Sequence, residues 1–151
     1  MTEDTLAYIA ITRLQAAYAD VVTRRAWPEL EELFLADAPI HVDTVTREVV
    51  ELVGPRALGE FVGSAIEHFE FLEFVILNTV LDIGTDGTAV GRLYMVELRQ
   101  ERGSGEWSNA FGLYRDRYVS VDGRWSFAER HYRSLARKIG ADPATVFPIP
   151  T

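Results

Sequence analysis

Apolar residues recur at the helical spacing near the start of the chain. From Thr5 to Arg25 they repeat every three or four positions, and this period predicts an α-helix. Further apolar residues widen the stripe until little of the helix is polar, so we expect the helix to be enclosed by the rest of the protein. The stripe comprises Leu6, Ile9, Ala10, Leu14, Ala17, Tyr18, Val21 and Val22, widened by Ile11, Ala16 and Ala19.

Two shorter helices and a small hairpin are predicted next. Pro28 suits the first turn of a helix that begins near Trp27, because its missing N–H has no partner at that position. Gly54-Pro55-Arg56 opens another helical pattern. Between these helices, Ile40 to Val45 alternates as a strand does, and Val49 to Val53 can be its hairpin partner.

The second half of the chain is a series of long segments rich in aromatic and β-branched residues. Asp122-Gly123, between the last two segments, is the dipeptide that best fits a two-residue type I′ turn, which predicts an antiparallel hairpin. The predicted strands are Glu73 to Ile83, Thr88 to Gln100, Phe111 to Val121 and Arg124 to Arg130.

This order of elements predicts an α+β fold. A strongly curved antiparallel sheet wraps around the N-terminal helix, with the two further helices beside it, and makes a cone with a cavity at its open end. The length of 151 residues suits a single domain. We expect a core of about residues 5–137 and an irregular C-terminal tail, 138–151.

Composition narrows the classes of function. The net charge of −8 argues against a nucleic-acid partner, since phosphate binding needs clustered Lys and Arg. No apolar run approaches the roughly 20 residues of a membrane span, and the acidic, polar start is unlike a signal peptide, so we expect a cytoplasmic protein with no membrane partner. The chain has no cysteine, which excludes disulfides and thiolate chemistry.

Several short motifs follow one another between Leu6 and Arg137. They are Tyr18, Trp27-Pro28-Glu29-Leu30, Leu33-Phe34-Leu35-Ala36-Asp37-Ala38, Gly54-Pro55-Arg56, Asn78 with Asp82, Gly112-x-Tyr114-x-Asp116, Asp122-Gly123-x-Trp125 and Glu129-Arg130. In this order and spacing they resemble the SnoaL-like branch of the nuclear transport factor 2-like superfamily, which includes scytalone dehydratase, ketosteroid isomerase and polyketide cyclases. The resemblance implies a cystatin-like fold and a cofactor-independent lyase or isomerase that acts on a small hydrophobic oxygenated substrate, such as a polyketide- or steroid-like molecule.

One pair of residues departs from the pattern of this family. Its dehydratase-like members resemble one another in an Asp five residues after the equivalent of Tyr18 and a His four residues before the equivalent of Asn78. Such a pair can move a proton, because the carboxylate orients the imidazole and stabilises its charged form. Thr23 and Phe74 occupy these positions here. The chain therefore either uses other residues or has become a non-catalytic ligand-binding or dimerisation domain.

Strand alternation selects the remaining cavity candidates. If Phe74 faces the cavity, so does Asn78, which either donates a hydrogen bond to a ligand or satisfies backbone at a bulge. On the next strand, Met95 and Glu97 face inward. A Glu in an apolar cavity has a raised pKa and can act as a general base, whereas a solvated Glu at the rim of the cavity has no catalytic role. An error of one residue in the strand register would move Glu97 from the first position to the second.

The last predicted strand places Arg130 and Tyr132 on the cavity face. Arg130 either neutralises an enolate or carboxylate or is paired with Asp43 or Glu97. Tyr18 and Tyr132 can meet across the pocket and donate hydrogen bonds to a carbonyl oxygen, although a tyrosine hydroxyl more often lies at the surface. The same alternation puts the following residues on the outer face: Trp125, Phe127, Glu129 and His131.

The three histidines differ in the roles that their positions predict. His41 lies two residues before Asp43 on the short strand, so the two share a face as an oriented base or a weak metal pair. Two ligands do not make a metal site and no third is clear, so we expect no metal and take His41, with Glu97, as a candidate proton carrier. His68 is expected to be solvated, and His131 to be structural or interfacial.

The outer face of the sheet is a candidate interface. Proteins of the family that this chain resembles often dimerise through that face. A large aromatic patch left exposed to solvent would otherwise favour aggregation. We therefore predict a homodimer. The candidate interface residues are Tyr94, Trp107, Trp125 and Phe127.

Overall fold

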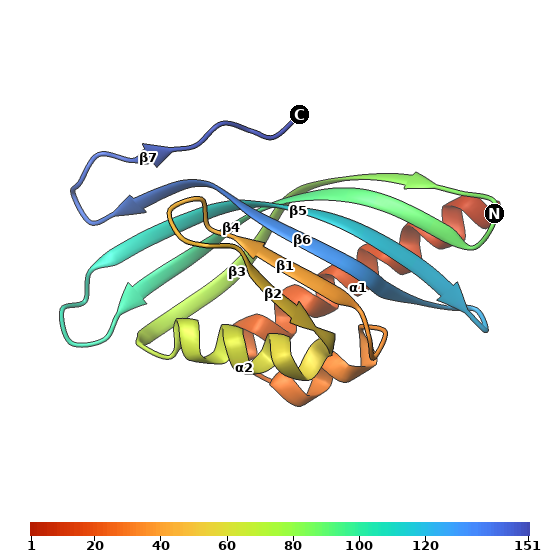
Figure 1. Cartoon of the computed structure of the whole chain (residues 1–151), viewed down its shortest axis with the longest axis horizontal. Helices are drawn as coiled ribbons and strands as arrows, with labels where there is room; N and C mark the ends of the chain where they lie inside the picture. Colours follow the sequence, from red (N-terminus) through yellow and green to blue (C-terminus); the bar gives the residue numbers. More distant parts are fainter.

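Three helices lie along the concave face of a curved sheet in the computed structural model, which describes residues 1–151 (Figure 1). The helices are α1 (Glu3–Arg24), the 3₁₀-helix η1 (Trp27–Glu32) and α2 (Gly54–Ile66). The strands are β1 (Pro39–Asp43), β2 (Val50–Val53), β3 (Phe69–Ile83), β4 (Thr88–Glu101), β5 (Trp107–Val121), β6 (Arg124–Ile139) and β7 (Thr145–Val146). The predicted α+β fold and its element order are confirmed.

The sheet has the strand order β2-β1-β6-β5-β4-β3, and β7 pairs with β6. Strands β3 to β6 form the predicted antiparallel meander, and the turn between β5 and β6 has φ of 52° at Asp122 and 80° at Gly123, as a type I′ turn requires. The predicted antiparallel sheet is mixed at one pairing, because β1 is parallel to β6. These two strands are far apart in sequence, so no hairpin constrains their relative direction.

Helix α1 is held at both ends and is only partly enclosed. The Thr2 hydroxyl accepts a hydrogen bond from Thr5 N at 3.2 Å, and Arg25 ends the helix in the left-handed conformation. Its later turns bury residues such as Tyr18 and Val22. Leu6 and Ile9 are 55% and 40% exposed, so the predicted enclosure is wrong for the first turns. No helix has the length and apolar character needed to cross a membrane.

Two of the four register shifts in the sheet change which predicted site residues face the helices. Ile76 pairs with Met95 and Asn78 with Tyr94, so Leu77 is an extra residue in β3. In β6, Ala128 is the extra residue between the paired positions Phe127 and Glu129. Each extra residue reverses the alternation beyond it.

The core shows the effect of the bulge in β6. Phe127 is fully buried and its ring stacks on Phe34 at 4.7 Å between centroids, so its prediction as an outer-face residue is wrong. Trp125 is half-buried against the same core.

Strand β6 continues to Ile139, and Phe147 N donates a hydrogen bond to Leu135 O, so the C-terminal tail returns along β6 (Figure 1).

The loop between β1 and β2 contains a strained residue. Val45 has φ of 68°, a left-handed conformation that a β-branched residue rarely adopts. Val45→Gly is expected to stabilise the protein by about 0.5–1 kcal/mol in urea denaturation, since relief of the strain outweighs the flexibility of glycine. Val49→Gly, in the same loop without positive φ, is the matched control and should give no gain. Equal effects of the two substitutions would contradict this interpretation.

Candidate functional site

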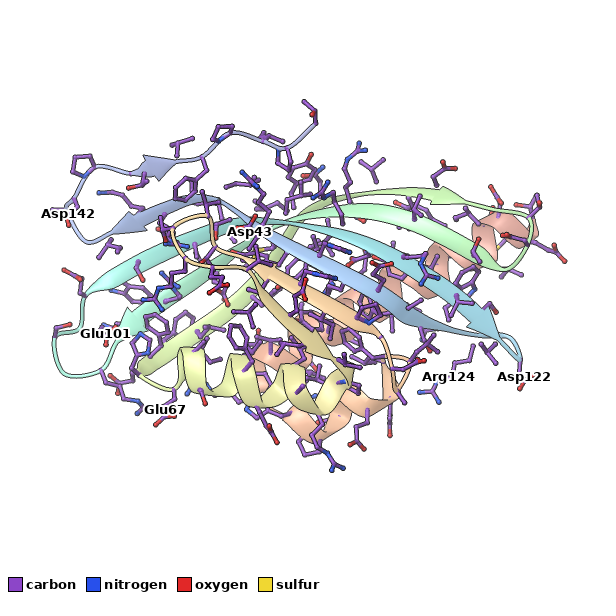
Figure 2. All side chains as sticks on the ribbon, viewed as in Figure 1. Asp43, Glu67, Glu101, Asp122, Arg124 and Asp142 are labelled. Carbon is purple, nitrogen blue, oxygen red and sulfur yellow. The ribbon has the colours of Figure 1, made fainter.

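A cavity of about 630 Å³ lies between the concave face of the sheet and helices α1 and α2. Hydrophobic residues make up 17 of its 29 lining residues. Such a cavity suits a small, mostly apolar molecule. Its mouth includes His68 and Glu101, at the end of the sheet opposite the Asp122 turn (Figure 2). The predicted cavity is therefore present and open.

Arg130 lies in this cavity and is held by a carboxylate. Its Nε and Nη2 atoms donate to Asp116 Oδ1 at 2.7 Å and Oδ2 at 2.9 Å. Both side chains are almost fully buried. Burial alone would lower the pKa of Arg130, but the Asp116 charge and hydrogen bonds outweigh it, so the pKa is raised and the guanidinium stays charged.

Aromatic rings surround the Arg130 guanidinium and leave one donor free. Its central carbon lies 3.8 Å from the Tyr114 ring centroid and 4.3 Å from those of Tyr18 and Phe127. The Nη1 atom is buried and has no hydrogen-bond partner. Because Arg130 lines the cavity, this atom can donate to an oxygen of a bound molecule.

The Arg130–Asp116 pair belongs to a buried hydrogen-bond chain that extends to α1. The Tyr118 hydroxyl donates to Asp116 Oδ2 at 2.8 Å, and Gln15 Nε2 donates to the Tyr118 hydroxyl at 2.8 Å. The sequence predicted an inward Arg130 correctly and offered two roles for it, the neutralisation of a substrate charge or a pair with an acidic residue such as Asp43 or Glu97. The structure gives Asp116 as the acidic partner. Asp116 was missed as the partner because it lies opposite Arg130 only when the bulge at Ala128 shifts the register of β6 against β5. Without that bulge, Asp116 would lie opposite Glu129.

Glu97 is one of three ionisable residues of β4 that line the cavity, together with Arg99 and Glu101. It lines the cavity beside Met95, as the alternation predicted, and its side chain is only 17% exposed. Burial raises the pKa of Glu97, and the charge of Arg99, whose Nη1 lies 4.0 Å from Glu97 Oε1, opposes this only in part. A weakly paired carboxylate with a raised pKa is suited to taking up and returning a proton.

Three tyrosines share the cavity with these groups. Tyr18, Tyr114 and Tyr132 all line it, and the rings of Tyr114 and Tyr132 are 5.0 Å apart. Burial raises the pKa of each phenol, so all three stay protonated at neutral pH and can donate hydrogen bonds. The sequence selected Tyr18 and Tyr132. Tyr114 appeared only within a family motif.

Gly112 makes room for Tyr132. A Cβ atom at Gly112 would lie 2.1 Å from Tyr132 Cε2, so Gly112→Ala must displace the ring. We expect this substitution to destabilise the protein by about 1–3 kcal/mol in urea denaturation and to weaken ligand binding in the cavity. In a Tyr132→Leu background the same substitution should cost much less, because the clash is gone. An equal loss in both backgrounds would mean that the ring is not the cause.

Thr23 and Phe74, which occupy the positions of the family's Asp–His pair, are in contact. Phe74 N donates to Thr23 Oγ1 at 3.0 Å, so helix α1 and strand β3 are joined at this point. Phe74 lines the cavity and packs edge-on against Tyr18 with ring centroids 5.5 Å apart. Thr23 is not among the lining residues, so the structure shows it holding backbone and not facing a ligand.

Besides Thr23, which was also expected to contact the substrate, three predicted site residues lie outside the cavity. Asn78 is exposed, because the bulge at Leu77 reverses the alternation of β3. Ile40 and Val42 line the cavity, so His41 and Asp43 project from the opposite face of β1. Asp43 pairs with Arg133 at 3.1 Å, where β1 ends and the β1–β2 loop begins (Figure 2). The expectation that these residues face the ligand is wrong.

The mouth of the cavity carries charged residues that sequence reasoning did not select. Arg99 donates to Ser108 Oγ at 3.1 Å, and Arg137 donates to Thr44 O at 2.9 Å, which holds the β1–β2 loop. His68 is 53% exposed and lies 3.6 Å from Glu101, close to its expected solvated state. Charged residues at chain positions this far apart give no sequence signal of a shared rim.

The outer face lacks the continuous aromatic patch that motivated the homodimer. Phe127 is in the core, and Tyr94 and Trp125 are half-buried. Trp107 is 55% exposed, but it lies beside Phe71 with ring centroids 5.6 Å apart. The homodimer stays a prediction based on the family resemblance.

The sequence model of the family described as "SnoaL-like domain" matches residues 3–131. No curated protein matches the chain. Among solved structures, a candidate scytalone dehydratase from Novosphingobium aromaticivorans DSM 12444 is similar, with 22% identity, a TM-score of 0.79, and coverage of 100% of this chain and 99% of that chain.

Two further solved structures have the same fold. The hexachlorocyclohexane dehydrochlorinase LinA-type3 from Novosphingobium barchaimii LL02 is 18% identical with a TM-score of 0.80, over 96% of this chain and 97% of that chain. An NTF2-like protein with a cystatin-like fold from Novosphingobium aromaticivorans is 18% identical with a TM-score of 0.69, over 85% of this chain and 81% of that chain. At these identities the likeness establishes the fold.

Proposed function

Because this chain belongs to the SnoaL-like domain family, we propose that it is a cofactor-independent lyase or isomerase that acts on a small hydrophobic oxygenated molecule, such as a polyketide- or steroid-like compound. One observation carries the proposal. Glu97 and Arg130 line the same largely apolar cavity, and the buried Nη1 of Arg130 has no hydrogen-bond partner. A base and an oxyanion donor are the two groups that proton transfer next to a carbonyl requires.

The proposed reaction begins with removal of a proton from the carbon next to a carbonyl group. The Glu97 carboxylate takes this proton, the electron pair of the C–H bond forms a carbon–carbon double bond, and the π electron pair of the carbonyl moves onto its oxygen. Arg130 Nη1 and the phenol of Tyr18 or Tyr114 donate hydrogen bonds to that oxygen as its negative charge develops. The donors lie in place before the reaction, so they need little reorganisation.

Two outcomes can follow the enolate. In dehydration, Glu97 returns the proton to a hydroxyl on the neighbouring carbon, and that carbon–oxygen bond breaks to release water. In isomerisation, Glu97 returns the proton to a different carbon of the conjugated system. The names of two similar structures, a candidate dehydratase and a dehydrochlorinase, both denote eliminations and favour the first outcome.

Solvent exchange tests this proposal with model compounds in place of the natural substrate. The protein is incubated in D₂O with a panel of hydroxylated polycyclic ketones, and deuterium uptake at the carbon next to the carbonyl is followed by NMR. Loss of water is followed by mass spectrometry. We expect enzyme-dependent exchange for at least one compound. Val62→Phe, which fills part of the cavity wall, should weaken both binding and exchange.

A second candidate function is ligand binding without catalysis. It is favoured because Thr23 and Phe74 occupy the positions of the family's acid–base pair. Phe74 N donates a hydrogen bond to Thr23 Oγ1, so the Thr23 hydroxyl holds backbone at this point. This alternative predicts that compounds of the panel bind in the cavity and that Val62→Phe weakens their binding. It also predicts no exchange above the buffer rate, which would overturn the enzymatic proposal.

A further inference from the structure

The outer face of the sheet brings together residues that are distant in the sequence. Parallel pairing of β1 with β6 places His41 directly beside His131, and antiparallel pairing of β1 with β2 places Glu51 on the other side of His41. The two imidazole rings are stacked, with centroids 4.2 Å apart and planes inclined by 7°. His41 lies on the face opposite the cavity, so this pair is separate from the site described above.

A carboxylate completes the group. Glu129 Oε1 lies 2.7 Å from His131 Nε2, and the ligand atoms of His41, Glu129 and His131 all lie within 4.8 Å of one another. Two imidazoles and one carboxylate are ligands that Zn²⁺ and similar ions prefer. We propose that these three residues form a binding site for a divalent transition-metal ion of the Zn²⁺ type on the outer face of the sheet.

The site needs only small side-chain movements to bind an ion. Metal–ligand bonds of about 2.0–2.2 Å in a tetrahedral site place ligand atoms roughly 3.3–3.5 Å apart. Glu129 Oε1 and His131 Nε2, now 2.7 Å apart, must therefore separate slightly, and separations near the 4.8 Å limit must shorten by about 1 Å. The side chains of His41, Glu129 and His131 are 29%, 31% and 38% exposed, which leaves them room to rotate. Their backbones are fixed by paired strands, which holds the three ligands in register.

Neighbouring residues support the site and also limit its strength. The Glu51 carboxylate lies 3.4 Å from His41 Nδ1 and can accept a hydrogen bond that orients the ring, as carboxylates do for many metal-binding histidines. Glu129 and His131 line a groove of about 470 Å³, so an ion can reach them from solvent. Arg117 lies 3.4 Å from Glu129 and competes with the ion for this carboxylate, and Arg115 is opposite His131.

Titration with ZnCl₂ tests the proposal on the untagged full-length chain. Isothermal titration calorimetry should show one site per chain, and the ion should raise the melting temperature because it binds the folded protein. His41→Ala, His131→Ala and Glu129→Gln should each weaken binding about tenfold or more. Arg117→Gln should strengthen it about twofold to fivefold, because it removes the competitor for Glu129.

His68→Ala is the matched control, since it removes the histidine that lies at the cavity mouth. It should leave Zn²⁺ binding unchanged. Circular dichroism checks that each variant is folded. If a histidine variant does not fold, Glu129→Gln still tests the site. Zn²⁺ binding that survives in both Glu129→Gln and folded His41→Ala, or that His68→Ala weakens equally, would overturn the proposal. So would the absence of any binding to the parent chain.

Discussion

Replacing Glu97 with glutamine is expected to lower the rate of proton exchange or elimination by about 10²- to 10⁴-fold, the usual contribution of a general acid–base group. Glutamine has nearly the same shape and lines the cavity in the same way, but it cannot accept the proton. Ligand affinity should therefore change little while kcat falls. The measurement is the rate of deuterium uptake at saturating ligand, compared between the parent and Glu97→Gln.

The same substitution should make the folded protein more stable at neutral pH. Burial raises the pKa of Glu97 above its ordinary value of 4.5, so folding disfavours the charged form. The stability contributed by this group is complete below the pKa of the unfolded chain and is lost as the pH rises through the raised pKa of the folded protein. The advantage of Glu97→Gln, measured by urea denaturation, should therefore shrink as the pH falls towards 4.5.

Glu106→Gln is the matched control for both measurements, because Glu106 lines the cavity mouth and has an exposed side chain. It should leave the rate and the pH dependence of stability unchanged. If Glu97→Gln keeps the parent rate, Glu97 is not the base. If it loses activity without gaining stability at neutral pH, the raised pKa does not explain its role.

The sequence predicted the elements well because local patterns determine them. The Asp122-Gly123 turn is encoded by two residues whose conformations are rare elsewhere, and the structure has both at positive φ. Glu97 was placed correctly in the cavity for a related reason. Strand β4 pairs with β5 in an unbroken register, so simple alternation holds from Leu93 to Glu97.

Bulges explain the main errors in placing side chains. Leu77 and Ala128 are the extra residues of two strands, and neither residue type marks a bulge in a sequence. Each shifts the alternation by one position, which moved Asn78 to the outside and Phe127 into the core. Periodicity alone cannot detect an inserted residue that keeps the strand continuous.

Pairing between strands distant in the sequence was also beyond prediction. The sequence showed no third ligand near His41 and Asp43, so no metal site was expected. Two of the three proposed ligands, Glu129 and His131, come from β6, and only the parallel register of β1 with β6 places them beside His41. The partner of Arg130 was missed for a similar reason, since the choice of Asp116 over Asp43 or Glu97 depends on the register of β5 with β6.

Arg130→Met is expected to destabilise the protein by about 3–5 kcal/mol, because it leaves the Asp116 carboxylate buried without its cation. The double variant Arg130→Met/Asp116→Asn should recover most of this loss, since a neutral amide can still accept the hydrogen bond of Tyr118. Arg117→Met, which breaks the exposed pair with Glu129 one position along the same ladder, is the control and should cost less than about 1 kcal/mol.

These free energies of unfolding come from urea denaturation at neutral pH, and the coupling energy follows from the cycle of single and double variants. A large positive recovery means that Asp116 is present to hold a charged donor in the cavity and not to stabilise the fold. If the double variant is as unstable as Arg130→Met alone, the loss arises instead from the packing of the guanidinium against Tyr18, Tyr114 and Phe127. In that case Arg130 is part of the core, and the developing negative charge on a substrate needs another donor.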